Sequence, residues 1–327
     1  MSASKVRPKI FLTRKLLAPA FDLLKGRYEI RSWNEDVTVP RDILLKEVET
    51  ADALYCVAMD KIDEELLERG KNLKVIATMS VGYDHIDVGA CRSRGIKLGY
   101  TPDVLSEACA ELGVALVLCT SRRLIEANRD VHTGQWKTWY PMYMCGRGIL
   151  DSVVGIVGLG RIGASIAEKL KAFHPKEILY NNRKPSQQGD LLGAIYVPLD
   201  DLLRRSDFVI SCCPLSKETT HLFNRDKFAL MKPTAQFFNL SRGGVVDQEA
   251  LYDALVNRKI LAAGLDVCTP EPLPTDHKLL KLTNFVMLPH ISSATVETRI
   301  RMATLASENI IAGLEGGPLP AEIPQGS

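Results

Sequence analysis

Short apolar runs recur along the first third of the chain, and polar segments with helical spacing separate them. In one such segment Ile62, Leu66 and Leu67 stand among charged residues, which is the apolar stripe of a helix that covers a sheet. Strands that alternate with helices favour a parallel sheet. We therefore predict a small doubly wound domain built on five strands: Ile10–Thr13, Tyr28–Ile30, Ala53–Val57, Leu73–Ala77 and Ile96–Gly99.

The same alternation resumes in the second half of the chain. Segments 199–205 and 248–256 have the spacing of helices, and further apolar runs predict strands at Val153–Val157, Glu177–Tyr180, Phe208–Ser211, Ala235–Asn239, Ala262–Val267 and Phe285–Leu288. A last helical pattern spans 294–314 and stops at Gly316-Gly317-Pro318. Because 327 residues exceed the usual size of one core, we predict an α/β protein with two doubly wound parallel-sheet domains, residues 1–104 with 294–327 and residues 105–293.

A glycine-rich turn follows the strand expected at Val153–Val157. Its glycines have the spacing G-x-G-x-x-G, and a helix-like sequence follows, which is the context of a dinucleotide-binding fingerprint. The first glycine permits the tight turn, the second lets the backbone approach a pyrophosphate, and the third allows close packing of helix and strand. The alternative is a structural turn without a ligand. We expect the cofactor to be bound by Gly158, Gly160, Arg161, Ile162 and Gly163.

The end of the next strand indicates which nucleotide is bound. An NAD site usually carries an acid there for the ribose hydroxyls, whereas this strand ends in Asn181-Asn182-Arg183-Lys184, with no carboxylate before Asp190. Arg183 and Lys184 would attract a 2′-phosphate, and an arginine grips phosphate through two parallel N–H bonds. The sequence therefore predicts NADP(H). The alternative is that both cations are ordinary solvated loop residues.

Three later segments each place a chemically useful side chain after a predicted strand. They contain Arg242 in a glycine-containing turn, Glu271 between two prolines, and His290 at the end of an apolar run. Ligands of open α/β sheets gather at the carboxyl ends of strands. A histidine donates a proton well near neutral pH, a neighbouring carboxylate favours its charged form, and an arginine binds a carboxylate. We predict Arg242, Glu271 and His290 as the catalytic residues.

Residues 133–148 differ from their surroundings. Two Trp, two Tyr and two Met cluster there among Gly and Pro. Rigid aromatic surface is enriched at protein interfaces, so we predict a dimerisation arm and a homodimer. A loop that folds its aromatic side chains onto its own subunit is the alternative.

Composition excludes several classes of protein. Hydrophobic residues make up 46% and charged residues 24%, and a net charge of +2 does not favour nucleic acid or an anionic membrane as partner. The eight cysteines lack C-x-x-C pairs and are expected to be reduced thiols, and no metal site is expected. The N-terminus lacks an apolar signal core, and no apolar run is long enough to cross a bilayer. These features predict a cytoplasmic protein.

The motifs together resemble the D-isomer-specific 2-hydroxyacid dehydrogenases, and among them the animal members that reduce glyoxylate and hydroxypyruvate. The resemblance extends over nearly the whole chain and rests on these segments: Met79–His85, Gly99–Asp103, Val157–Gly163, Asn239–Gly243, Gly264–Pro274 and Leu288–Thr295. It implies a Rossmann domain that binds NADP(H), inserted into a flavodoxin-like substrate domain, and NADPH-dependent reduction of a small 2-oxo acid to a 2-hydroxy acid.

The resemblance also implies roles for individual residues. His290 would be the acid/base with Glu271 as its partner, and Arg242 would bind the substrate carboxylate together with the backbone N–H groups of Val81 and Gly82.

Three further residues are expected near the ligands. Ser293 would lie near the substrate's hydroxymethyl group, Trp139 near the active site of the other subunit, and Asp266 would contact the cofactor.

Two departures from the animal pattern stand out. Ser292 takes the place of a glycine, which bears on substrate preference, and Asn181-Asn182 take the place of small residues. Two alternatives stay open: another dehydrogenase of the 3-phosphoglycerate or D-lactate type, and a nucleotide-sensing corepressor-like binding protein. Phosphoglycerate dehydrogenases usually carry the acid for NAD, which this chain lacks.

Overall fold

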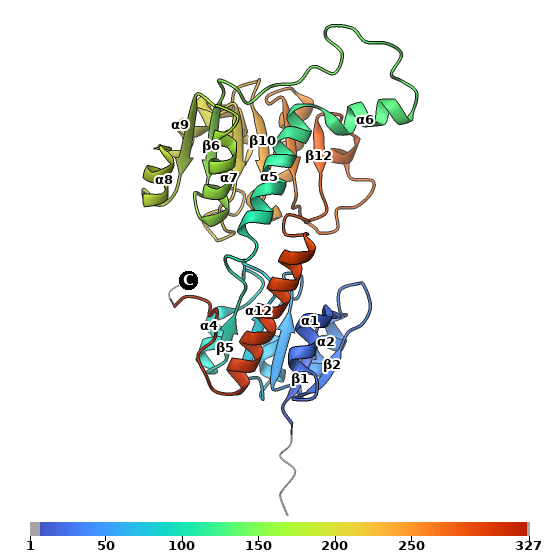
Figure 1. Cartoon of the computed structure of the whole chain (residues 1–327), viewed down its shortest axis with the longest axis vertical. Coiled ribbons are helices and arrows are strands. Elements are labelled where there is room, and N and C mark those ends of the chain that lie inside the picture. Colours follow the sequence, from blue (N-terminus) through green and yellow to red (C-terminus); the bar gives the residue numbers. More distant parts are fainter. Residues whose placement is uncertain (1–6, 326–327) are drawn as a thin grey trace, which may run out of the picture. The chain divides into compact units, whose positions relative to one another are not determined.

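The computed structural model describes residues 7–325, and the chain forms two compact units, each built around its own parallel sheet (Figure 1). Unit 1 contains the residues up to Leu105 and those from Ala294 onward, and unit 2 contains Ser106–Ser293. None of the helices within residues 7–325 is long and apolar enough to cross a membrane.

Unit 1 has a five-stranded sheet in the order β2-β1-β3-β4-β5, with parallel pairing throughout. Its strands are β1 (Lys9–Leu12), β2 (Glu29–Ser32), β3 (Ala53–Cys56), β4 (Val75–Thr78) and β5 (Lys97–Gly99). This strand order is that of a flavodoxin-like doubly wound sheet. The predicted fold of this domain is confirmed.

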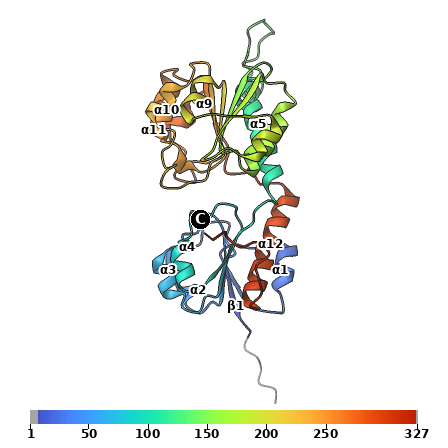
Figure 2. The same cartoon turned by 90° about the vertical axis from the view of Figure 1, so that its left-hand side faces the viewer.

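Helices cover both faces of this sheet. One face carries α1 (Ala18–Leu24) and α12 (Val296–Leu314), and the other carries α2 (Arg41–Val48), α3 (Glu64–Arg69) and α4 (Val88–Ser93) (Figure 2). Because both faces are covered, every residue of β3 and β4 is buried, which explains why these strands read as unbroken apolar runs rather than as alternating patterns.

Unit 2 has a seven-stranded parallel sheet in the order β12-β11-β10-β9-β6-β7-β8. Its strands are β6 (Val153–Val157), β7 (Glu177–Asn181), β8 (Ile195–Tyr196), β9 (Phe208–Ser211), β10 (Gln236–Asn239), β11 (Ala262–Leu265) and β12 (Phe285–Met287). From β6 the chain adds β7 and β8 on one side of this strand. It then returns to the other side of β6 and adds β9, β10, β11 and β12 in turn. The reversal at β6 is the switch point at which a Rossmann sheet binds its dinucleotide. The predicted Rossmann fold is confirmed.

The helices of unit 2 form two layers. The helices α5 (Ser106–Ser121) and α7 (Arg161–Lys171) pack on one face, whereas α9 (Leu199–Arg205), α10 (Arg225–Leu230) and α11 (Gln248–Val256) pack on the other (Figure 2).

Some short elements of unit 2 differ from the sequence prediction. Strand β8 has only two residues, both exposed, so it shows no apolar pattern. Helix α6 (Leu124–His132) follows α5 and has no buried residue, and the short α8 (Gln187–Leu192) buries only Gly189. Strand β8 is too short to show a hydrophobic period, whereas α6 is amphipathic but buries none of its residues.

Candidate active site

The glycine-rich turn after β6 has a geometry that requires glycine at two of its three positions. Gly158 has a φ of 97°, and a Cβ there would lie 2.6 Å from the backbone nitrogen of Cys213. A Cβ on Gly163 would lie 2.3 Å from the carbonyl oxygen of Gly158. A Cβ on Gly160, in contrast, would meet nothing within 4 Å, so the space beside Gly160 is open.

Helix α7 begins directly after this turn. Gly160 is its N-cap residue and supplies no side-chain cap. Arg161 and Ile162 open the helix, and the backbone N–H groups of a first helical turn have no intrahelical acceptor. Such a helix start beside open space suits a pyrophosphate, so the turn fits the expected cofactor.

The end of β7 carries the residues expected to select the nucleotide. Arg183 and Lys184 are both exposed and lie two and three residues after the strand. Asn181 and Asn182 stand before them, so residues 181–184 contain amides and cations but no carboxylate. A negatively charged 2′-phosphate would be attracted there.

Arg242 lies in the turn between β10 and the 3₁₀ helix Gly243–Val245. The Asn239 side-chain amide donates to the Arg242 carbonyl at 2.9 Å, and the Arg242 guanidinium donates to the Ser241 carbonyl at 3.0 Å. A Cβ on Gly243 would lie 2.1 Å from the backbone carbonyl of Cys268. The arginine turn therefore packs against the loop that leads to Glu271, a contact that only glycine permits.

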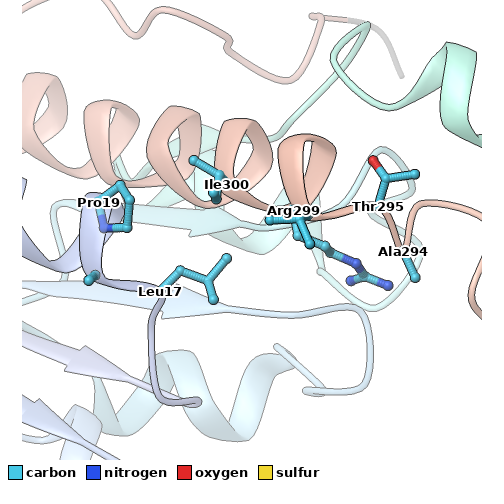
Figure 3. A pocket seen from close by; sticks show the side chains of 8 residues that line it. Leu17, Pro19, Ala294, Thr295, Arg299 and Ile300 are labelled. Carbon is cyan, nitrogen blue, oxygen red and sulfur yellow. The ribbon is translucent and has the colours of Figure 1, made fainter.

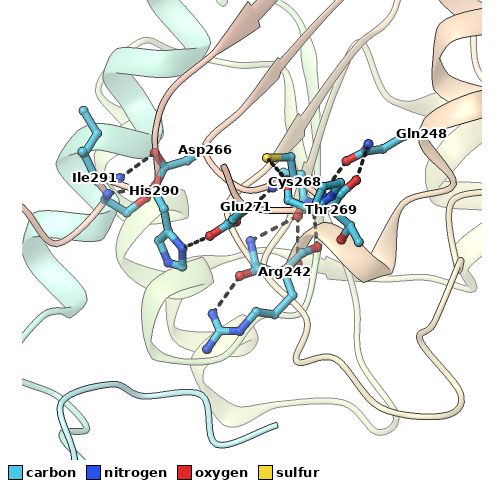
Figure 4. A network of polar contacts seen from close by, with 12 residues as sticks. Arg242, Gln248, Asp266, Cys268, Thr269, Glu271, His290 and Ile291 are labelled. Carbon is cyan, nitrogen blue, oxygen red and sulfur yellow. Dashed lines mark hydrogen bonds and ion pairs between the residues drawn. The ribbon is translucent and has the colours of Figure 1, made fainter. Parts of the chain in front are cut away.

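Glu271 and His290 form a hydrogen-bonded pair, with 2.8 Å between Glu271 Oε2 and His290 Nδ1 (Figure 4). The other carboxylate oxygen of Glu271 accepts from the Cys268 N–H at 3.0 Å. Burial raises the pKa of Glu271, but the hydrogen bond and charge of His290, the Cys268 N–H and the Arg242 charge outweigh burial and leave this pKa below its usual value. Glu271 is therefore an anion at neutral pH, and its partner His290 is 35% exposed.

Asp266 holds the loop on which His290 lies. The Asp266 carbonyl accepts from the His290 N–H at 2.8 Å, and its two carboxylate oxygens accept from the N–H groups of Ile291 and Ser292, each at 2.8 Å (Figure 4). The Ser292 hydroxyl donates to the same carboxylate. These contacts hold His290 in a left-handed backbone conformation with a φ of 55°, which costs a non-glycine residue roughly 1–3 kcal/mol.

This role of Asp266 was not predicted from the sequence, from which only a contact with the cofactor was expected. Asp266 directly follows the buried strand β11 and is itself fully buried. A buried carboxylate needs hydrogen-bond donors. An aspartate at the end of an apolar strand was therefore a sequence feature from which such a structural role could have been predicted. The contact of Asp266 with the cofactor stays a prediction.

The predicted substrate residues lie in different parts of the chain. Ser293 is in the same loop as His290 and belongs to unit 2 with Arg242 and Glu271. Val81 and Gly82 belong to unit 1, in the loop after β4, where the Ser80 hydroxyl donates to the Gly82 carbonyl at 2.7 Å. Trp139 lies in the exposed segment 133–148. The roles of these residues stay predictions.

A separate apolar pocket of about 350 Å³ occurs in unit 1, between the start of α1 and the first turns of α12 (Figure 3). None of the predicted site residues lines it. Its lining residues are Leu17, Ala18, Pro19, Ala294, Thr295, Val296, Arg299 and Ile300.

The chain is similar to known proteins over most of its length. The model of the NAD-binding domain of D-isomer-specific 2-hydroxyacid dehydrogenases matches residues 114–292. The human glyoxylate reductase/hydroxypyruvate reductase is 47% identical over 319 residues, which cover 96% of this chain and 97% of the human protein.

Two crystal structures are also similar over almost the full length. A protein from Thermus thermophilus has a TM-score of 0.91 and 41% identity, and the match covers 97% of this chain and 100% of that protein. An NADPH-dependent glyoxylate/hydroxypyruvate reductase from Sinorhizobium meliloti, in complex with NADP and malonate, has a TM-score of 0.84 and 32% identity, with 97% of each chain covered.

Proposed function

Because the chain belongs to the D-isomer-specific 2-hydroxyacid dehydrogenases, we propose that it reduces glyoxylate to glycolate and hydroxypyruvate to D-glycerate with NADPH. The observation that carries this proposal is the pair Glu271–His290, joined at 2.8 Å in the unit that also contains Arg242 and the dinucleotide fingerprint. The full-length similarity to a human protein named for these two substrates supports the choice of substrate.

Each residue of the site has a separate task in this reaction. A bound reduced nicotinamide supplies the hydride that C2 of the 2-oxo acid receives. Arg242 binds the substrate carboxylate and draws electron density from the adjacent carbonyl. The His290 imidazolium gives its proton to the oxygen that becomes negative, and the Glu271 anion favours the imidazolium and fixes the orientation of the ring.

The proposal is tested by following the nicotinamide absorbance with purified protein. We expect oxidation of NADPH with glyoxylate and hydroxypyruvate, and slower oxidation with pyruvate or with NADH as cofactor. Preference for NADH with pyruvate would favour a D-lactate type enzyme. Tight binding of nucleotide without turnover of any of these acids would favour a corepressor-like protein.

Replacement of Arg183 by alanine tests the cofactor assignment. A charge-assisted contact typically contributes about 1.5–3 kcal/mol, so we expect NADPH binding to weaken roughly ten- to a hundred-fold and NADH binding to change little. Calorimetric titration with each cofactor measures the effect. Arg204→Ala, which removes an exposed arginine from α9, is the control. Equal losses for NADPH and NADH would contradict a contact with the 2′-phosphate.

Replacement of Glu271 by glutamine tests the partner of His290. Glutamine keeps the size of the side chain but removes the negative charge that favours the imidazolium. We therefore expect kcat for hydroxypyruvate reduction to fall, but by less than for His290→Asn, because the ring loses only its anionic partner. Steady-state kinetics of the two variants measure the difference. A Glu271→Gln enzyme with the kcat of the wild type would contradict a role of Glu271 in the reaction.

We also propose that the chain forms a homodimer through α6 and the arm at 133–148. Trp139 and Met142 are 76% and 75% exposed, and Trp136 is 57% exposed, so the arm does not fold these side chains onto its own subunit. Leu124 and Ile125 on α6 are more than half exposed as well. Exposed aromatic and large apolar side chains are enriched at protein interfaces, and a symmetric dimer is the commonest oligomer.

Sedimentation velocity checks the dimer. The wild type is expected to sediment as a dimer at micromolar concentration. The double variant Ile125→Asp and Trp139→Asp should sediment as a monomer, because it places charge on both parts of the apolar surface. Leu191→Asp, at an 80% exposed leucine outside this surface, is the control and should remain dimeric. A wild type that sediments as a monomer would refute the proposal.

A further inference from the structure

Three hydrogen bonds join the glycine-rich turn to the end of β7. The Gly158 N–H donates to the Asn181 carbonyl at 2.9 Å and continues the pairing of β6 with β7. The Leu159 N–H donates to Oδ1 of Asn182 at 2.7 Å, and Nδ2 of Asn182 donates back to the Leu159 carbonyl at 3.3 Å. The Asn182 amide therefore binds both main-chain polar groups of Leu159.

Leu159 lies where the backbone of the turn has the most conformational freedom. It stands between Gly158 and Gly160, and glycines lose more conformational freedom than other residues when a turn becomes ordered. The Leu159 side chain is 2% exposed and fixes the residue from the core side. The backbone of Leu159 is held by the two hydrogen bonds to Asn182. A turn that is ordered before binding loses less entropy when the phosphates arrive.

We propose that Asn182 is a positioning residue for the phosphate-binding turn, and that it supports the pyrophosphate of NADPH and NADH equally. This inference rests on the proposed binding of a dinucleotide. It gives neighbouring residues different tasks: Asn182 acts on the part of the cofactor that both nucleotides share, whereas Arg183 acts on the 2′-phosphate.

An amide suits this task better than the acid found in NAD sites. Asn182 uses an acceptor toward the Leu159 N–H and a donor toward the Leu159 carbonyl. A carboxylate keeps the acceptor, lacks the donor, and would place a negative oxygen opposite that carbonyl. Asn182→Asp therefore loses one of the two hydrogen bonds to Leu159, and Asn182→Ala loses both.

The test measures the binding of NADPH and NADH to the full chain by calorimetric titration. For Asn182→Ala we expect both affinities to fall by a similar factor of about 5- to 50-fold, from the loss of two hydrogen bonds. Hydrogen–deuterium exchange of the free protein should be faster in a peptide that spans the turn at 158–163. Arg183→Ala should weaken NADPH alone and leave this exchange unchanged.

Asn182→Asp distinguishes two roles of Asn182: holding the backbone of Leu159, and direct contact with the ribose. If Asn182 acts through Leu159, the aspartate weakens NADH binding as well as NADPH binding. If it acts by contact with the ribose hydroxyls, the aspartate strengthens NADH binding, and that result would overturn the proposal.

Asn284→Ala is the matched control. Asn284 directly precedes β12, and its amide also donates to two backbone carbonyls, those of Leu255 and Leu261, rather than to the turn. We expect a lower melting temperature at most and unchanged affinity for both cofactors. Wild-type affinities in Asn182→Ala, together with unchanged exchange, would also overturn the proposal. A wild type that binds neither cofactor would instead refute the proposed function.

Discussion

Replacement of His290 by asparagine is expected to lower kcat for hydroxypyruvate reduction by about 10²- to 10⁴-fold, the usual effect of removing a positioned general acid. His290 is hydrogen-bonded to an anionic carboxylate at 2.8 Å and 35% exposed, so its ring is oriented on one side and accessible to a ligand. Asparagine cannot supply a proton. NADPH binding should be unchanged, because the phosphate turn follows a different strand.

Asparagine is chosen because it should preserve the backbone conformation at position 290. His290 has a φ of 55°, and asparagine adopts the left-handed region more readily than most residues. His174→Asn is the matched control, since His174 also has a positive φ of 53° but lies in the connection between α7 and β7. The measurement is the pH profile of kcat for the wild type and both variants. A His290→Asn enzyme with near-normal kcat would leave solvent as the proton source.

The sequence predicted the architecture well where strands are buried on both faces. The residues of β3, β4, β9 and β10 are all buried, and mostly apolar runs mark β3, β4 and β9 clearly. Strand β10 has polar residues at both ends, Gln236 and Asn239, and two phenylalanines between them. The reversal of strand order at β6 could also be expected, because the glycine-rich turn identifies the strand at which a Rossmann sheet changes direction. The two-residue strand β8 has no such signal, and α6 is amphipathic but has no buried residue.

The residues of the candidate site could be predicted from the sequence, but the contacts between the loops that carry them could not. Arg242, Glu271 and His290 each follow a strand of a parallel sheet, and the carboxyl ends of such strands lie on one edge. The contact between Gly243 and Cys268, in contrast, joins two loops that are distant in the sequence. The sequence shows a glycine there, but not the backbone that passes beside it.

The role of Ser292 illustrates the same limit. As a residue that replaces glycine near the site, it was expected to affect substrate preference. In the structure its hydroxyl donates to the buried carboxylate of Asp266, and the side chain is 8% exposed. Only the fold reveals this contact, because the two residues come from the ends of different strands. Ser292 therefore acts on the loop of His290.

Replacement of Arg242 by alanine is expected to lower kcat/KM by about 10³-fold or more. The estimate combines the loss of a charge-assisted contact with the carboxylate, about 1.5–3 kcal/mol, and the loss of a donor that polarises the reacting carbonyl, about 2.7–4 kcal/mol. In the proposed reaction the first contact would exist in the bound substrate and in the transition state, and the second would strengthen as the oxygen becomes negative. KM should therefore rise while kcat falls.

Arg242→Lys distinguishes the two contributions of this side chain. Lysine keeps the positive charge but lacks the planar pair of donors that matches a carboxylate. We expect an intermediate kcat/KM, with most of the remaining loss in KM. Arg225→Ala, which removes an exposed arginine paired with Asp253, is the control and should leave both constants unchanged. An Arg242→Ala enzyme with a raised KM and a normal kcat would limit Arg242 to binding and assign the polarisation of the carbonyl to His290 alone.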